Sequence, residues 1–356
     1  MGSWLWDEQG QKYLDLYGGN AVISIGHSHP HYVNALKNQL DKISFYSNSV
    51  QNPLQEKLAE KLGHMSGYID YQLFLCNSGA EANENALKVA SFVTGRKKVI
   101  AFRKSFHGRT SGAVAATDNP KMVAPFNAGH DIVFLPLNDE NAFAAAINKE
   151  VAAVIIEGIQ GVGGIHVPNG SFLQLISKKC KEAGALLILD EVQSGYGRTG
   201  RFFAHQHTGI TADLITIAKG MGNGFPVGGV LIQPDIKPWH GMLGTTFGGN
   251  YLACVASLAV LEVMEKEGLM ENADRVGKKL TSQLREFGKI QDVRGRGLMI
   301  GFDLPENLSS VRSNLLTKHH IFTGEAKPHT MRLLPSLAIK AHELSGFLTA
   351  LNEELK

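Results

Sequence analysis

Two adjacent acids follow an apolar run near the middle of the chain. The stretch ALLILDEVQSG, residues 185–195, predicts a buried strand that ends at Asp190 and Glu191. A buried carboxylate is costly unless a cation or hydrogen-bond donors compensate its charge. A metal ion, a nucleotide-bound Mg²⁺ and a cationic organic cofactor would each do so, and an acid that simply ends a strand is the alternative.

A lysine ends a second apolar run. Lys219 directly follows ADLITIA, residues 212–218. Burial lowers the pKa of a lysine and makes its amine nucleophilic, whereas a lysine whose stem alone is buried would keep its charge in water. The following GMGNGF lacks the GxGxxG spacing of a dinucleotide site, and no GxxxxGK[ST] occurs that would accompany a magnesium-binding strand of an NTPase.

A strand, a tight turn and a helix are predicted over FLCNSGAEANENALKVA, residues 74–90. Ser78, Gly79 and Ala80 would present a hydroxyl and free amides at the helix N-terminus, where a phosphate can bind. The alternative is a helix cap, with Ser78 or Asn77 as the cap and Glu81 completing a capping box.

The three features come from one predicted sheet. Short apolar runs at 71–75, 98–102, 131–137, 151–157, 185–190, 212–218 and 227–232 alternate with helical patterns at 84–93, 142–148 and 172–184. Near-continuous apolar strands that alternate with helices predict an α/β fold with a mostly parallel, seven-stranded sheet. Ligands of such sheets bind beyond the carboxyl ends of the strands.

A phosphate site, a carboxylate and an amine at one sheet edge match the needs of a single cofactor. Pyridoxal 5′-phosphate carries a phosphate, a pyridinium nitrogen and an aldehyde. The sequence therefore predicts pyridoxal 5′-phosphate, with Ser78, Asp190 and Lys219 as its contacts.

Three segments are expected along the chain. Residues 1–40 contain a hairpin, WLWDEQGQKYLDL, and should pack with a smaller α+β domain at 250–356, while residues 41–249 form the large cofactor-binding domain. The smaller domain begins with a long helix at 250–268 and includes a strand at 298–304.

The composition excludes several partners. The 356 residues have 44% hydrophobic and 19% charged residues and a net charge of +2, which gives no reason to expect nucleic acid or a membrane. Three widely spaced cysteines without a CxxC pair predict reduced thiols and a cytoplasmic location. The histidines of GHSHPH (26–31) and HQH (205–207) lack further ligands at metal spacing, so no metal is expected.

A family resemblance covers nearly the whole chain. The stretches that carry it are YLDLYGGNAVISIGHSHP, NSGAEANENALK, SFHGRT, IEGIQGVGG, LILDEVQSGYGRTG, TIAKGMGNGFPVG, GTTFGGN, VRGRGLMIG and MRLLPSLAI. The sequence resembles the class III, fold type I, pyridoxal-phosphate-dependent aminotransferases, and most closely the acetylornithine aminotransferases of arginine biosynthesis.

The resemblance assigns cofactor contacts residue by residue. It implies that Lys219 bonds to the cofactor aldehyde and moves protons, and that Asp190 pairs with the pyridinium nitrogen. It implies that Gln193 contacts the ring oxygen and that Phe106 stacks on the ring face. It also implies that Gly79 and Ala80 bind the phosphate and that Thr246 reaches the phosphate of the neighbouring subunit.

The resemblance also implies a reaction. Arg109 would hold a substrate carboxylate, Thr245 would contact the acylornithine, and Arg332 would bind the α-carboxylate of glutamate and 2-oxoglutarate. The expected enzyme moves the δ-amino group of N-acetylornithine to 2-oxoglutarate in a homodimer with shared active sites. Alternative donors are N-succinylornithine, ornithine, N-succinyl-diaminopimelate and 4-aminobutyrate, and a non-catalytic binding protein of this fold is the alternative from another class.

Two positions depart from the family pattern. Where the family has E-P-I-Q-G-E-G-G, this chain has Gly158 in place of the proline and Val162 in place of the second glutamate. In related ω-aminotransferases that glutamate neutralises the arginine equivalent to Arg332, and a valine cannot.

Overall fold

A seven-stranded sheet forms the centre of the larger part of the molecule. The computed structural model describes all residues, 1–356. The strand order is β3 (Gln72–Cys76), β9 (Gly228–Ile232), β8 (Leu214–Ile217), β7 (Leu186–Asp190), β6 (Val151–Glu157), β4 (Lys98–Phe102) and β5 (Ile132–Leu135). Strand β9 is antiparallel to both neighbours and the remaining pairs are parallel. The predicted α/β fold is confirmed.

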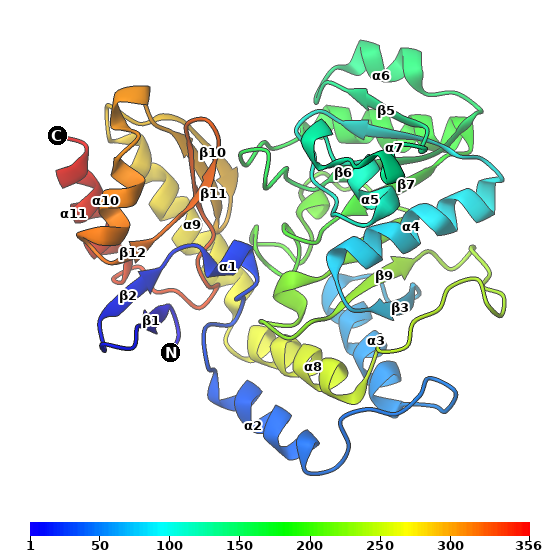
Figure 1. Cartoon of the computed structure of the whole chain (residues 1–356), viewed down its shortest axis with the longest axis horizontal. Coiled ribbons are helices and arrows are strands. Elements are labelled where there is room, and N and C mark those ends of the chain that lie inside the picture. The colour runs from blue at the N-terminus through cyan, green and yellow to red at the C-terminus, as the bar shows by residue number, and fades with distance from the viewer.

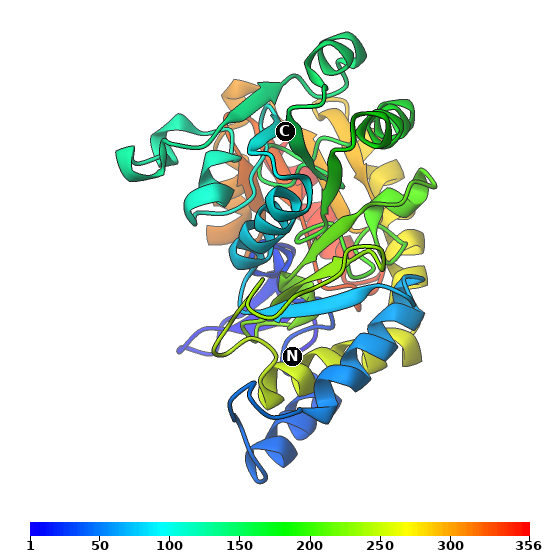
Figure 2. The ribbon, with the colours of Figure 1, turned by 90° about the vertical axis from the view of Figure 1, so that its right-hand side faces the viewer.

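Helices cover both faces of this sheet (Figures 1 and 2). They are α3 (Pro53–Ser66), α4 (Gly79–Thr94), α5 (Ser111–Ala115), α6 (Glu140–Ala146) and α7 (Gly170–Ala183). Alternate residues of β7 belong to different hydrophobic clusters, because successive side chains of a strand point to opposite faces. Leu187 and Leu189 pack in the cluster that contains α7, whereas Leu186 and Ile188 pack in the cluster that contains α4.

Two smaller sheets lie on the other side of the molecule, near both chain ends (Figure 1). One has the order β10 (Gln291–Arg296), β11 (Met299–Asp303), β14 (Thr330–Leu333) and β13 (Gly324–Ala326). The other joins the N-terminal hairpin, β1 (Trp4–Trp6) and β2 (Lys12–Asp15), to β12 (Ile321–Phe322). The N-terminal hairpin thus pairs with a strand from near the C-terminus.

The remaining helices link these parts. They are α1 (Gly18–Ala21), α2 (Pro30–Leu40), α8 (Tyr251–Lys266), α9 (Leu269–Arg285), α10 (Val311–Thr317) and α11 (Leu344–Glu354). Helix α8 contacts α2 and α3 as well as α9, so it lies between the regions assigned to different domains (Figure 1). The boundaries at residues 40 and 249 stay predictions. No helix has the length and apolarity that crossing a membrane requires.

The strand register brings chemical groups to one edge of the large sheet. Glu157, the last residue of β6, pairs with Asp190, the last residue of β7, and Asp190 pairs with Thr216 of β8. Lys219 is the second residue after the end of β8. Since these strands are parallel, their carboxyl ends place both acids and the lysine at the same edge.

Glu191 anchors the turn that follows β7 and does not line the cavity at this edge. Its carboxylate accepts hydrogen bonds from the Ser194 hydroxyl (2.6 Å), the Ala204 and His205 amides (both 3.0 Å) and the His205 ring (Nδ1, 2.7 Å). The other ring nitrogen of His205 lies 2.6 Å from the Tyr68 hydroxyl. One buried network thereby joins side chains that follow α3 and β7 to the short 3-10 helix at Ala204–His207.

Replacing Glu191 with alanine should lower the free energy of unfolding by about 3–5 kcal/mol, because several buried donors lose their acceptor at once. Denaturant titration monitored by circular dichroism measures this. Glu182→Ala, which breaks only an ion pair at the surface of α7, is the matched control and should change the unfolding midpoint little. Equal stability of the two variants would contradict the role given to Glu191.

Candidate active site

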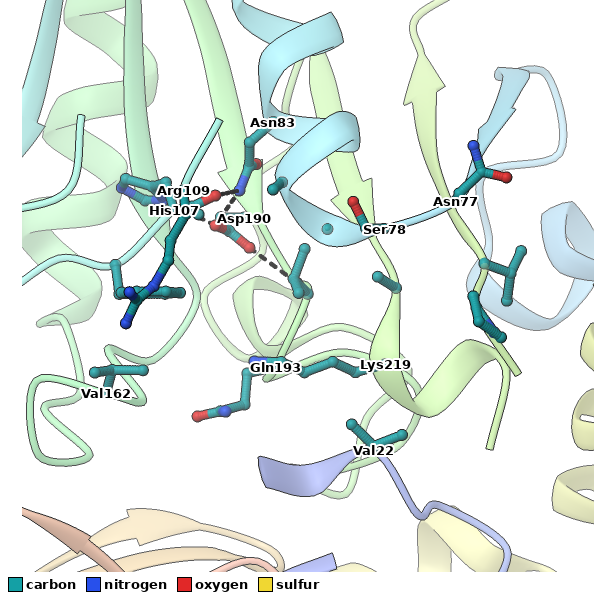
Figure 3. A pocket seen from close by; sticks show the side chains of 18 of the residues that line it. Val22, Asn77, Ser78, Asn83, His107, Arg109, Val162, Asp190, Gln193 and Lys219 are labelled. Atoms are coloured by element: carbon teal, nitrogen blue, oxygen red, sulfur yellow. Dashed lines mark hydrogen bonds and ion pairs between the residues drawn. The ribbon is translucent and has the colours of Figure 1, made fainter. Parts of the chain in front are cut away.

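A cavity of ≈ 410 Å³ opens at the carboxyl ends of the central strands (Figure 3). Among its lining residues are those predicted from strand ends, from the helix N-terminus and from the SFHGRT and DEVQ motifs: Ser78, Gly79, Ala80, Phe106, Arg109, Asp190, Gln193 and Lys219. The structure therefore brings these predicted residues together. It places Thr245, Thr246 and Arg332 outside the set that lines this cavity.

Asp190 is compensated by hydrogen-bond donors that the sequence analysis did not identify. Its Oδ2 accepts from Asn83 Nδ2 (2.8 Å) and lies 2.7 Å from His107 Nδ1, and its Oδ1 accepts from the Val192 amide (3.0 Å). Thr216 donates to Asn83 Oδ1 (2.7 Å) and so orients the amide group of Asn83. The carboxylate is 4% exposed, and this network holds it facing the cavity (Figure 3).

The sequence gives one indication of Asn83 and His107. Both belong to motifs already singled out, NSGAEANENALK and SFHGRT. Neither their residue type nor their position in these motifs identifies their partner, and only the folded chain shows that it is Asp190.

Lys219 is partly buried, and its Nζ makes no hydrogen bond or ion pair with the protein. Burial lowers its pKa to about 8, although the carboxylates of Asp190 and Glu157 oppose that shift. Its backbone adopts φ 47°, in the left-handed region that few non-glycine residues occupy. A neutral amine is therefore more accessible here near neutral pH than on an ordinary lysine.

Glu157 was not predicted as a site residue. Its two carboxyl oxygens accept from the Phe106 amide and the Gly161 amide, each at 3.0 Å. Burial raises the pKa of Glu157 to about 7. The side chain ties the segment that carries Phe106 to the loop after β6.

The N-terminus of α4 supplies both a cap and free amides. The Ser78 hydroxyl accepts from the Glu81 amide (3.2 Å), so the predicted capping occurs. The amides of Gly79 and Ala80 occupy the first helical positions, which have no partner inside a helix, and both residues line the cavity. A Cβ at Gly79 would stand 2.6 Å from Val192 Cγ1, so the close approach of the helix to the DEVQ turn requires glycine.

These groups fit pyridoxal 5′-phosphate. The cavity is lined by an unpaired amine on Lys219, a fixed carboxylate on Asp190, and helix amides where an anion can bind. Gln193 donates to the Asn20 carbonyl (3.1 Å), while its Oε1 is buried without a partner. Phe106, half-buried, forms part of the wall.

The two predicted substrate arginines differ in availability. Arg109 is exposed, lines the cavity and has no hydrogen-bond partner. Arg332 is 4% exposed and donates to the carbonyls of Gly161 (3.0 Å) and Glu325 (2.9 Å). It forms no ion pair with any acid, and burial lowers its pKa.

Thr245 and Thr246 line a different, more open cavity. They share it with Cys76, Asn77 and Glu81, among others. Thr245 accepts from the Gly248 amide (3.0 Å) and from Asn77 Nδ2 (3.5 Å). Asn77 also lines the cavity of Lys219, so the two cavities adjoin.

Four of the five histidines considered as metal ligands each pair with one acid, and His207 lies beside the Thr199 carbonyl instead. His27 lies 2.8 Å from Asp15, and His29 lies 3.0 Å from Glu267. No group of three or more His, Cys, Asp or Glu side chains is arranged to hold a metal ion.

Comparisons with known proteins agree with this geometry. Residues 1–355 match the family model "Aminotransferase class-III". Acetylornithine aminotransferase of Archaeoglobus fulgidus is 42% identical over 346 residues, which cover 96% of this chain and 91% of that protein. The acetylornithine aminotransferase of Bacillus subtilis is 40% identical, over 99% of this chain and 93% of that protein.

A solved structure gives the same picture of the fold. The ornithine aminotransferase of Toxoplasma gondii, described with pyridoxal phosphate at partial occupancy, superposes with a TM-score of 0.92 at 30% identity, covering 99% of this chain and 88% of that one. The residues that line the cavity, the family match and the structural similarity lead to one conclusion: the chain belongs to the class III family of pyridoxal-phosphate-dependent aminotransferases.

Proposed function

We propose that this enzyme transfers the δ-amino group of N-acetylornithine to 2-oxoglutarate. The observation that carries the proposal is the unpaired amine of Lys219, which lines one cavity with Asp190 and with the free guanidinium of Arg109. The acetylornithine aminotransferases that match at about 40% identity over nearly the whole chain support the choice of donor. A non-catalytic binding protein of this fold would have no need of such a lysine.

The chain's own groups divide the chemistry between them. Bound pyridoxal 5′-phosphate supplies an aldehyde that takes up the amino group and a ring that withdraws electrons. Asp190, held by Asn83 and His107, would place its carboxylate against the pyridinium nitrogen. Lys219 Nζ would accept the proton from the donor carbon that bears the amino group and deliver it to the carbon of the cofactor aldehyde.

Arg109 favours an acylated donor. Its guanidinium is positioned to hold the donor's α-carboxylate, since a planar fork binds a carboxylate with two hydrogen bonds. Free ornithine would bring an α-ammonium close to this cation, whereas acylation of that nitrogen removes the charge. N-succinylornithine shares this advantage and stays the main alternative donor.

The donor is tested by half-reactions of the cofactor-loaded enzyme with N-acetylornithine, N-succinylornithine and ornithine, followed by the cofactor absorbance. We expect N-acetylornithine to exceed ornithine by about tenfold in the second-order rate constant, which corresponds to about 1.4 kcal/mol of charge repulsion. Lys219→Ala should be colourless and inactive, and Lys121→Ala at the surface should behave as wild type. Equal rates for all three donors would refute the assignment.

Arg332 is proposed to bind the α-carboxylate of 2-oxoglutarate and glutamate. It is anchored by backbone carbonyls alone, one of which belongs to Gly161, next to Val162. No protein carboxylate forms an ion pair with it, although the charges of Glu157 and Glu325 oppose the effect of burial on its pKa. The acceptor would therefore meet an arginine that no ion pair occupies.

Val162→Glu should raise the KM for 2-oxoglutarate by about tenfold, because a carboxylate beside Gly161 would pair with Arg332 and compete with the substrate. Steady-state kinetics with the acceptor varied would measure this change. Val162→Gln, equal in size but neutral, is the control and should leave the KM nearly unchanged. If both variants behave alike, Arg332 does not bind the acceptor.

We further propose a cytoplasmic homodimer in which active sites are completed across the interface. Thr245 and Thr246 lie outside the cavity of Lys219 but beside it, which suits contacts to a neighbouring subunit's site. The adjacent surface exposes Phe45 and Phe247, whose rings lie 5.4 Å apart. Exposed aromatic side chains of this kind mark interaction surfaces, and the three cysteines are free, as expected for a reducing compartment.

Light scattering coupled to size exclusion should give a mass of two chains of 38.6 kDa each. Phe247→Asp should shift the protein toward monomer by burying a charge in the interface. Trp6→Asp, at an exposed aromatic of the N-terminal hairpin, should not. A wild-type protein that is monomeric at micromolar concentration would exclude the shared site.

A further inference from the structure

A second cavity lies beside the cofactor cavity. It has a volume of ≈ 400 Å³ and shares Phe106 and Val162 with the first cavity as lining residues. Its walls come from the segment after β4, the loop after β6, and the small sheet with its turn at 327–329. Nothing in the proposed transamination uses it.

The acids that line this cavity already have cationic partners. Arg103 Nη1 lies 3.0 Å from Asp118, and Arg294 Nη2 lies 3.0 Å from Asp303. Asp118 also accepts from the Lys104 amide at 2.7 Å. These carboxylates are therefore not free to neutralise further positive charge.

Two lysines of the lining have no acidic partner. Lys104 Nζ lies 3.3 Å from His166 Nε2, and it forms no ion pair. Lys327 forms no side-chain hydrogen bond or ion pair, and neither does its neighbour His329. The cavity thus gathers two uncompensated ammonium groups and two imidazoles, all of which can donate hydrogen bonds to an anion.

The direction of the pKa shift of His166 indicates the sign of the electrostatic potential inside the cavity. Burial lowers its pKa, and the charges of Lys104 and Arg294 lower it further, against the opposing effect of Asp292 and Asp303. The electrostatic potential at His166 is therefore positive, which agrees with the absence of acidic partners for Lys104 and Lys327.

We propose that this second cavity binds the carboxylate of a small organic anion, held by Lys104 and Lys327 with His166. A carboxylate would compensate the exposed ammonium groups of Lys104 and Lys327 and accept a charge-assisted hydrogen bond from each, beside the half-buried ring of His166. The shared walls allow two sources of the carboxylate: the distal end of an acyl chain on a donor in the first cavity, or a separate small anion such as a four-carbon dicarboxylate.

Calorimetric titration of the cofactor-loaded enzyme with succinate tests the site. We expect binding that weakens with salt, and a Kd that rises about tenfold or more in Lys104→Ala/Lys327→Ala. Lys97→Ala/Lys149→Ala removes the same charge from the opposite edge of the sheet, where both lysines precede strands, and should bind as wild type. The proposal is wrong if succinate does not bind, if the first double variant binds as tightly as wild type, or if Arg109→Ala alone abolishes binding.

Kinetics separate the two sources. A raised KM for N-succinylornithine but not for N-acetylornithine in Lys104→Ala/Lys327→Ala would identify the acyl chain of the donor. Unchanged KM values with lost succinate binding would identify a separate anion. The calorimetric result stands without turnover, so an enzyme inactive with both donors would refute the proposed function and leave the anion site to be judged by titration alone.

Discussion

The burial of the Asp190 carboxylate at the end of β7 is the constraint on which the site depends. A carboxylate that is 4% exposed needs donors around it, and the fold supplies them from three directions: Asn83 on α4, His107 after β4, and the amide of Val192. Because α4 must come close enough for Asn83 to reach, its first residue contacts the DEVQ turn and must be glycine. The buried carboxylate of Asp190 thus constrains the positions of α4, of the loop after β4 and of the DEVQ turn at residues 190–193.

The same arrangement controls the reactive amine. Lys219 follows the neighbouring strand, so its Nζ lies in the region that Asp190 and Glu157 charge negatively, while burial acts in the opposite direction. The balance leaves its pKa at about 8, lower than that of a lysine in water and higher than burial alone would produce. Glu157 links this region to Phe106 and Gly161, and Gly161 in turn accepts from Arg332. Hydrogen bonds therefore connect Phe106 in the cavity wall through Glu157 to Gly161, and Gly161 to Arg332.

The two acids of the DEVQ motif show that adjacent residues can have different tasks. Successive residues at a strand end point in different directions, so Asp190 faces the cavity and Glu191 faces the interior, where His205 and Tyr68 continue its network. The first acid lines the cavity and the second holds the turn. Arg332 illustrates a different point: with valine at position 162, this buried arginine is held by two backbone carbonyls and forms no ion pair.

Much of the fold was accessible from the sequence, since apolar runs bounded by turn residues coincide with all seven strands of the large sheet. Helix α4 begins at Gly79, at the N-terminus predicted from Ser78, Gly79 and Ala80, and Ser78 caps it before the apolar pattern at 84–93 starts. The ends of some strands differ from the predicted runs. The strand expected at 131–137 is limited to Ile132–Leu135.

The sequence by itself determined which residues end the strands and begin the helix, and hence that Asp190, Lys219 and the amides after Ser78 would meet at one edge. Local periodicity and the parallel order of the sheet suffice for that. Only the tertiary structure decided the partners: Asn83, His107 and Thr216 around Asp190, the carbonyls that hold Arg332, and the unpaired lysines of the second cavity. These contacts join residues far apart along the chain, and their distances depend on how helices and sheets pack, which no local pattern encodes.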